Sequence, residues 1–152
     1  MAAKTLAPNL VRTIVDAVRQ SPDRDQAITR AVSLLKEHVP HYSWVGVYLL
    51  DGDELVLGPY LGKPSPHTRI PLNRGICGAA ASEKATIVVD DVNADPRYLA
   101  CSIETKSEIV VPIMSGDTVH GEIDIDSDKR AAFGPDDRHL VEAVAAVLAE
   151  RF

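Results

Sequence analysis

Three acidic residues occupy two neighbouring predicted strands in the C-terminal half of the chain. A turn at residues 115–117 separates a strand that begins at Glu108 from one that carries Asp124 and Asp126. Apolar residues alternate with the acids in the second strand, so one of its faces is aliphatic and the other bears carboxylates. If the strands bring the acids together, their like charges raise at least one pKa, and a protonated carboxyl can donate a proton near neutral pH. The alternative is a solvated strand face.

Further polar residues continue the same alternation toward the turn. His120, Glu122 and Asp124 could hold a metal ion, but i, i+2 spacing on a strand is weak evidence for one. His120 and Glu122 can equally be exposed, and the pattern assigns neither a role. His67 is a lone histidine in a predicted loop, where we expect it to be solvated.

The chain has two cysteines, which are not in a CxxC arrangement and so do not indicate a zinc site. Cys101 lies in a long polar stretch, residues 90–106, and is either a reactive thiol or a small space-filling residue. Cys77 lies at the start of a predicted helix, where the helix dipole would lower its pKa. The small residues around Cys77 favour a packing role instead.

Aromatic residues give a second predicted strand, residues 41–50, a similar two-faced character. Alternation puts three of them on one face and three aliphatic residues on the other: Tyr42, Trp44 and Tyr48 against Val45, Val47 and Leu49. Aromatic rings beside carboxylates would enclose a small cationic or zwitterionic ligand.

The remaining pattern predicts the elements that position these residues. Apolar stripes predict helices over 7–20 and 22–37, the second with Ser21 as its N-cap, and a last helix that starts at 134. Strands are expected over 54–60 and 87–89, and a short helix over 76–82. We therefore predict an α+β domain with an antiparallel central sheet. The terminal helices should cover its aliphatic face, while the short helix and polar loops roof a pocket on the other.

Bulk properties restrict the classes of partner. The chain has 152 residues, which suits a single domain, 1–152, and its net charge of −6 disfavours binding to nucleic acid or anionic membrane. No apolar run approaches the length of a membrane span, and no signal-peptide pattern is present, so we expect a cytoplasmic protein with reduced thiols.

Several segments resemble the free methionine-(R)-sulfoxide reductases, which are single GAF-domain enzymes. The resemblance runs in order from Tyr42 to Phe133. It is carried by Trp44-Val-Gly-Val-Tyr48, Leu55-Val-Leu-Gly-Pro-Tyr60, Gly62-Lys-Pro64, Arg69-Ile-Pro71, Arg74-Gly-Ile-Cys-Gly78, Leu99-Ala-Cys101, Ser107-Glu-Ile-Val-Val-Pro112 and Gly121-Glu-Ile-Asp-Ile-Asp-Ser127. The combination of the two cysteines with the three acids is its most specific part.

The resemblance implies an activity and roles for particular residues. Cys101 would attack the sulfur of free methionine-(R)-sulfoxide, giving methionine and a sulfenic acid. Glu108, Asp124 and Asp126 would bind the substrate and protonate the sulfoxide, while Trp44 and Tyr48 would form an aromatic wall. Thioredoxin or a small thiol would be the reductant, no cofactor would be needed, and the terminal helices would pair in a homodimer.

One departure concerns the second thiol. His67 occupies the position where the family commonly has its resolving cysteine. Cys77 matches a further family cysteine and could substitute, or a small thiol or thioredoxin could reduce the sulfenic acid directly. Two alternatives remain: a non-catalytic GAF domain that binds a small molecule and dimerises, and a dimerisation domain with an empty pocket.

Overall fold

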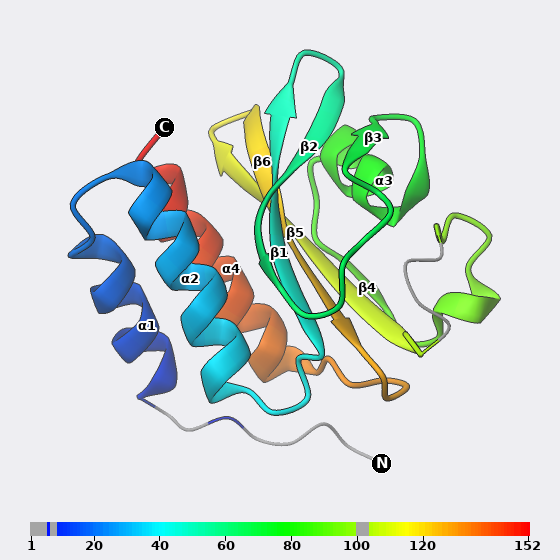
Figure 1. Ribbon diagram of the computed structural model, residues 1–152, viewed down its shortest axis with the longest axis horizontal. Helices are drawn as coiled ribbons and strands as arrows, with labels where there is room; N and C mark the ends of the chain where they lie inside the picture. The colour runs from blue at the N-terminus through cyan, green and yellow to red at the C-terminus, as the bar shows by residue number, and fades with distance from the viewer. Residues whose placement is uncertain (1–5, 7–8, 100–103) are drawn as a thin grey trace.

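The computed structural model describes residue 6 and residues 9–99 and 104–152. Helices pack against one antiparallel sheet (Figure 1). In chain order the described elements are α1 (Leu10–Arg19), α2 (Arg24–His38), β1 (Trp44–Asp51), β2 (Glu54–Leu61), β3 (Arg69–Pro71), α3 (Gly75–Glu83), β4 (Ile87–Val89), the short 3₁₀ helix η1 (Val92–Ala94), β5 (Ser107–Ser115), β6 (Thr118–Ser127) and α4 (Pro135–Ala149).

The sheet places the acidic strand at its centre. Its strand order is β3-β2-β1-β6-β5-β4, and the neighbouring strands pair antiparallel. β6 lies between β1, which carries the aromatic residues, and β5, which carries Glu108. The register sets Asp126 opposite both Trp44 and Glu108. Residues from three strands are thus brought to one region of the sheet.

Helices α2 and α4 cover one face of the sheet, and α1 packs against these two helices on their outer side (Figure 1). The aliphatic residues of β1 and β6 point into this layer, where Val45, Val47, Ile123 and Ile125 are completely buried. Full burial of such a side chain contributes about 1.5–3 kcal/mol. This packing fixes the alternation of β6 and forces its acids onto the opposite face.

Helix α3 and the surrounding loops cover that opposite face, as predicted. A second, smaller core forms there from Trp44, Tyr48, Ile70, Ile76, Cys77, Val92 and neighbouring apolar residues. Gly78 allows α3 to approach closely: a Cβ atom at this position would lie 2.9 Å from the carbonyl oxygens of Pro71 and Leu72. The polar face of the sheet is therefore roofed by protein.

Two local predictions were wrong. Asp23, rather than Ser21, is the N-cap of α2, and its carboxylate accepts a hydrogen bond from the Gln26 N–H at 2.8 Å. Tyr42 does not share a face with Trp44, because β1 begins only at Trp44 and the strand alternation does not extend back to Tyr42. Tyr42 is completely buried in the helix-side core.

Tyr42 belongs to a buried polar network that joins β1 to α4. The Tyr42 O–H donates to Asp137 Oδ1 at 2.7 Å, and His41 Nε2 lies 2.8 Å from the same oxygen. The Gly134 N–H donates to Asp137 Oδ2 at 2.9 Å. Burial opposes ionisation of Asp137, but hydrogen bonds from His41, Gly134 and Tyr42 hold its pKa below the usual range. The network fixes the start of α4 against the entry to the sheet.

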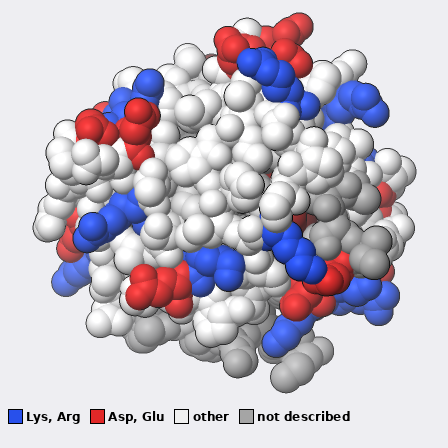
Figure 2. Space-filling view, in the orientation of Figure 1, with Lys and Arg blue, Asp and Glu red and all other residues white. Residues whose placement is uncertain are grey.

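The described surface is mixed in charge on the face shown in Figure 2. Basic and acidic side chains lie next to one another around its edge, and other residues form its centre. No helix within the described ranges is long and apolar enough to cross a membrane.

Candidate active site

A row of buried carboxyl groups lies under α3. Glu108, Asp124 and Asp126 are only 4%, 2% and 3% exposed, although each is ionisable. Asp124 and Asp126 project from alternate positions of β6, and Glu108 reaches the row from β5. The structure therefore brings together the three acids that the sequence singles out, and the solvated alternative is excluded for them.

Proximity and burial change how these acids hold protons. Burial raises the pKa of Asp124, although hydrogen bonding to Glu108 and Cys77 opposes the rise. Burial and the neighbouring Asp124 charge raise the pKa of Asp126 well above its ordinary value, again opposed by Glu108. One oxygen of each aspartate, Oδ1, has no hydrogen-bond partner among the described residues. The row can thus retain protons toward neutral pH and has capacity to bind a ligand atom.

Glu122 is a fourth buried acid, and the expectation that it can be exposed was wrong. It is completely buried, and neither carboxyl oxygen has a hydrogen-bond partner within the described ranges. Burial and the Asp124 charge raise its pKa well above the ordinary value, with the Cys77 thiol opposing the rise. Alternation alone put Glu122 on the acidic face; what it did not reveal is that α3 covers this position.

Cys77 belongs to the first turn of α3, and its side chain packs in the core between the helix and the sheet, where it borders the acids. It is 5% exposed. Burial, together with the carboxylates of Asp124, Glu122 and Glu108, raises the pKa of the Cys77 thiol well above its usual value. This is the reverse of the shift expected from its position near a helix N-terminus. In the structure Cys77 is thus a protonated thiol placed beside the acidic row.

A metal ion could in principle be held by Cys77, Glu108 and Asp124. One potential ligand atom from each lies within 4.8 Å of the others. We do not assign a metal ion to them, because the raised pKa values of Cys77 and Asp124 disfavour the deprotonated groups that bind a metal. His120 is not part of this group: it lies at the hairpin end, 2.9 Å from Ser115 Oγ, with its ring stacked on Phe152.

Two aromatic side chains stand beside the acids and are fixed by hydrogen bonds to the loop after β2. The Trp44 indole N–H donates to the Lys63 carbonyl at 2.9 Å, and the Tyr48 O–H donates to the His67 carbonyl at 2.8 Å. The Trp44 ring also lies over Gly46, where a Cβ atom would come within 2.3 Å of it. A glycine at this position is therefore required for the observed position of the indole.

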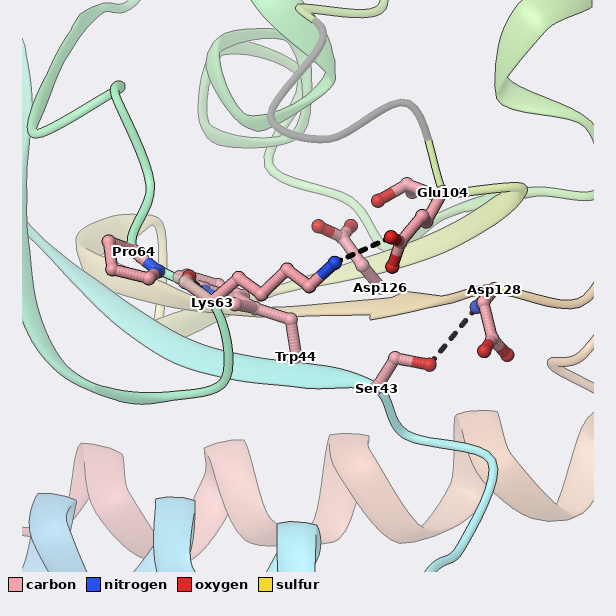
Figure 3. A pocket seen from close by; sticks show the side chains of 8 residues that line it. Ser43, Trp44, Lys63, Pro64, Glu104, Asp126 and Asp128 are labelled. Carbon is pink, nitrogen blue, oxygen red and sulfur yellow. Dashed lines mark hydrogen bonds and ion pairs between the residues drawn. The ribbon is translucent and has the colours of Figure 1, made fainter.

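Among the described residues, two pockets are lined by side chains on this side of the sheet. The larger encloses about 540 Å³ including its open mouth, and Ser43, Trp44, Lys63, Glu104, Asp126 and Asp128 line it (Figure 3). The smaller encloses about 260 Å³ and is lined by Tyr48, His67, Cys77, Leu99, Glu108 and Asp124.

The cross-strand pair Glu108 and Asp126 joins the two pockets, because each residue lines one of them. His67 is half-buried at the smaller pocket, so it is only partly exposed to solvent. Cys101 lies outside the described residues. The nearest described residues on its two sides, Leu99 and Glu104, line the smaller and the larger pocket respectively.

Comparison with known proteins identifies the class of protein. The GAF-domain family model matches residues 23–152, and the chain belongs to this family. A free methionine-R-sulfoxide reductase of Escherichia coli is 38% identical over 121 residues, covering 77% of this chain and 73% of the relative. Within the GAF family, the chain accordingly belongs to the free methionine-R-sulfoxide reductases, a group of oxidoreductases.

Solved structures agree with this assignment. The free methionine-R-sulfoxide reductase of Neisseria meningitidis, in complex with its substrate, superposes with a TM-score of 0.89 at 36% identity, covering 100% of this chain and 96% of that one. The type II enzyme of Thermoplasma acidophilum gives a TM-score of 0.80 at 36% identity, covering 90% of this chain and 93% of that one.

A further sequence relative, GAF domain-containing protein A of Dictyostelium discoideum, is 40% identical over 117 residues, covering 76% of this chain and 73% of that relative.

Proposed function

We propose that this chain reduces free methionine-(R)-sulfoxide to methionine, with Cys101 as the nucleophile. The observation that carries the proposal is the buried row of Glu108, Asp124 and Asp126 beside the Trp44 and Tyr48 rings. The Escherichia coli relative bears the name of this activity, and the Neisseria structure contains its substrate. A non-catalytic binding domain would not require Cys101 in addition to the acids.

Protonation of the sulfoxide is the first task of the site. The sulfoxide oxygen must gain a proton as its bond to sulfur breaks, since oxygen leaves poorly as a dianion. Burial raises the pKa of Asp124 and Asp126, so a carboxyl group that still holds its proton can donate it. In this proposal the carboxyls of Glu108, Asp124 and Asp126 hold the sulfoxide, and the rings of Trp44 and Tyr48 contact the methyl-sulfur end.

Oxygen transfer to the cysteine follows. The Cys101 thiolate attacks the substrate sulfur, and the protonated oxygen leaves as water, which gives a sulfonium in which the two sulfurs are bonded. Water then attacks the Cys101 sulfur and breaks that sulfur–sulfur bond, so Cys101 becomes a sulfenic acid and a proton is released. The substrate sulfur is reduced by two electrons and the cysteine sulfur is oxidised by two. Methionine leaves the pocket.

Regeneration of the thiol requires a second sulfur. His67 cannot form a disulfide, although its carbonyl is held at the pocket by Tyr48. Cys77 is the chain's other cysteine and borders the same acids. We assign it the resolving role, with thioredoxin or a small thiol then reducing the disulfide. The raised pKa of Cys77 disfavours its thiolate, so this step should be slow near neutral pH.

The setting of the reaction is part of the same proposal. A single domain spanning 1–152 would carry the whole activity, and pairing of the terminal helices would form a homodimer. A cytoplasmic location would keep both cysteines reduced between turnovers.

A turnover assay separates this function from its main alternative, a GAF domain that binds a ligand without reducing it. Methionine formation from the free R epimer is measured with dithiothreitol and separately with thioredoxin, for wild type, Cys101→Ser and Cys77→Ser. We expect wild type to turn over, Cys101→Ser to be inactive, and Cys77→Ser to lose thioredoxin-linked turnover. If wild type binds the ligand but forms no methionine with either reductant, the non-catalytic alternative is favoured. The presence of His67 where the family commonly has a cysteine also agrees with that alternative.

A further inference from the structure

An exposed ion pair spans the larger pocket. Lys63 Nζ lies 2.6 Å from Glu104 Oε1, and the two side chains are 67% and 60% exposed. Lys63 follows β2, whereas Glu104 precedes β5, so the pair joins segments on opposite sides of the pocket. Figure 3 shows the Lys63 side chain extended across the pocket toward Glu104, with Asp126 close by.

The backbone of Lys63 is held by the aromatic wall of the pocket. Its carbonyl accepts the Trp44 indole N–H at 2.9 Å, and the indole stacks on Tyr60 with ring centroids 5.6 Å apart. At the preceding position a Cβ on Gly62 would lie 2.6 Å from the indole, so only glycine lets the loop approach this closely. The base of the Lys63 side chain is thus fixed to the wall that would contact the substrate.

Charges of both signs converge at this pocket. Lys63 is the basic residue among those described as lining it, and the acids are Glu104, Asp126 and Asp128. A free amino acid carries one carboxylate and one ammonium group, which such a pair of side chains can bind together. An exposed ion pair contributes at most about 1 kcal/mol, so exchanging it for contacts with a ligand costs little.

The orientation of the substrate in the pocket follows from which charged side chains are buried and which are exposed. Asp126 is buried and pairs with Glu108, whereas Lys63 and Glu104 are exposed at the mouth. A side chain that points its sulfoxide toward the buried acids would leave its amino-acid head group at the mouth. A methionine sulfoxide residue within a peptide carries neither head-group charge.

We propose that Lys63 and Glu104 determine specificity for a free amino acid, Lys63 by binding the α-carboxylate and Glu104 by binding the α-ammonium group. This inference rests on the proposed function for the chemistry at the other end of the ligand. The pair would thereby exclude peptide-bound substrate, because a residue within a peptide has no α-carboxylate or α-ammonium group to replace the Lys63–Glu104 contact.

Binding to the Cys101→Ser variant tests the inference without turnover. Calorimetry would compare methionine-(R)-sulfoxide with its carboxamide, which lacks the carboxylate, and its N-acetyl derivative, which lacks the ammonium. Lys63→Met should weaken binding of the free amino acid by about 2- to 5-fold, as expected for an exposed charged contact, and leave binding of the carboxamide unchanged. Glu104→Gln should weaken binding of the free amino acid and spare the N-acetyl derivative. Arg69→Met, which removes an exposed cation paired with Glu54, is the matched control and should change nothing.

Three results would overturn the inference: no loss of affinity in Lys63→Met, an equal loss for the free amino acid and the carboxamide, or no binding of any of the three ligands. Failure of the proposed function is recognised separately. If the binding pattern is found but wild type forms no methionine, the head-group contacts stand and the reductase activity does not.

Discussion

Glu108 lies directly opposite Asp126 on the neighbouring strand, and both side chains are buried. Two carboxyl groups in this relationship cannot both ionise freely, because each charge would lie in a region of low polarity next to the other. Burial and the Asp124 charge raise the pKa of Asp126 well above its ordinary value, while hydrogen bonding to Glu108 opposes the rise, and this occurs where the two pockets meet. This arrangement connects the fold to the proposed chemistry.

Asp126→Asn should lower kcat/KM by about 100-fold or more, the usual contribution of a general acid. The amide keeps the shape of the side chain but cannot donate the proton. Because the pKa of Asp126 is raised, wild-type activity should fall as pH rises through that pKa, when the proton is lost. Asp117→Asn, at the exposed turn between β5 and β6, is the control. An unchanged rate in Asp126→Asn would remove this residue from the mechanism.

Glu122→Gln should become more stable relative to wild type as pH rises. The folded pKa of Glu122 lies above its ordinary value of 4.5, so the folded state binds the proton more tightly than the unfolded chain does. Its contribution to stability is complete below pH 4.5 and is lost as pH rises toward the folded pKa, by up to about 1.4 kcal/mol per pH unit. Urea unfolding of both proteins between about pH 5 and pH 8 measures the difference in their free energies of unfolding. Parallel stability curves would show that Glu122 has an ordinary pKa.

Asp137→Asn should destabilise the fold by about 3 kcal/mol at neutral pH, because it removes the charge at the centre of a buried network. The pKa of Asp137 is lowered, so its contribution is present at neutral pH and is lost as pH falls through the folded pKa. The difference between variant and wild type should therefore shrink in acid. Asp136→Asn changes the exposed neighbour and controls for the charge at the start of α4. Equal destabilisation by the two substitutions would contradict a specific role for the network.

Trp44→Ala should raise KM by about 10-fold, since the methyl-sulfur end of the substrate loses an aromatic contact that contributes up to about 1.5 kcal/mol. Trp44→Phe keeps an aromatic ring but loses the N–H that holds the Lys63 carbonyl. We expect it to fall between wild type and Trp44→Ala in steady-state assays. If Trp44→Ala leaves KM unchanged while the protein remains folded, the indole is not part of the substrate site.

Alternation along strands was enough to predict the two faces of β6 and of most of β1. It gave Ile123 and Ile125 to the core and Asp124 and Asp126 to the opposite face, because a strand paired on both sides has no freedom to rotate. The same rule failed at Tyr42, which precedes the strand. The alternation of apolar and polar residues does not show at which residue the pairing of a strand with its neighbours begins.

Burial of the acidic face was harder to predict than its composition. The pattern left open that Glu122 is exposed, and it is completely buried, whereas His67, expected to be solvated, is half-buried at the smaller pocket. Helix α3 covers Glu122, and Gly78 allows this helix to pack closely against the backbone of Pro71 and Leu72. The raised pKa of Cys77 has the same origin, because burial and, after it, three carboxylates from β5 and β6 outweigh the local effect of its own helix. Such effects follow from tertiary packing and leave no local signal in the sequence.

A single-turnover experiment without reductant tests the central claim most directly. Reduced wild type is mixed with excess free methionine-(R)-sulfoxide, and methionine and free thiols are counted. We predict about one methionine per chain, with loss of the Cys101 thiol followed by loss of the Cys77 thiol as the disulfide forms, and no methionine from Cys101→Ser or from the S epimer. Methionine formation by Cys101→Ser, or none by wild type, would contradict the account.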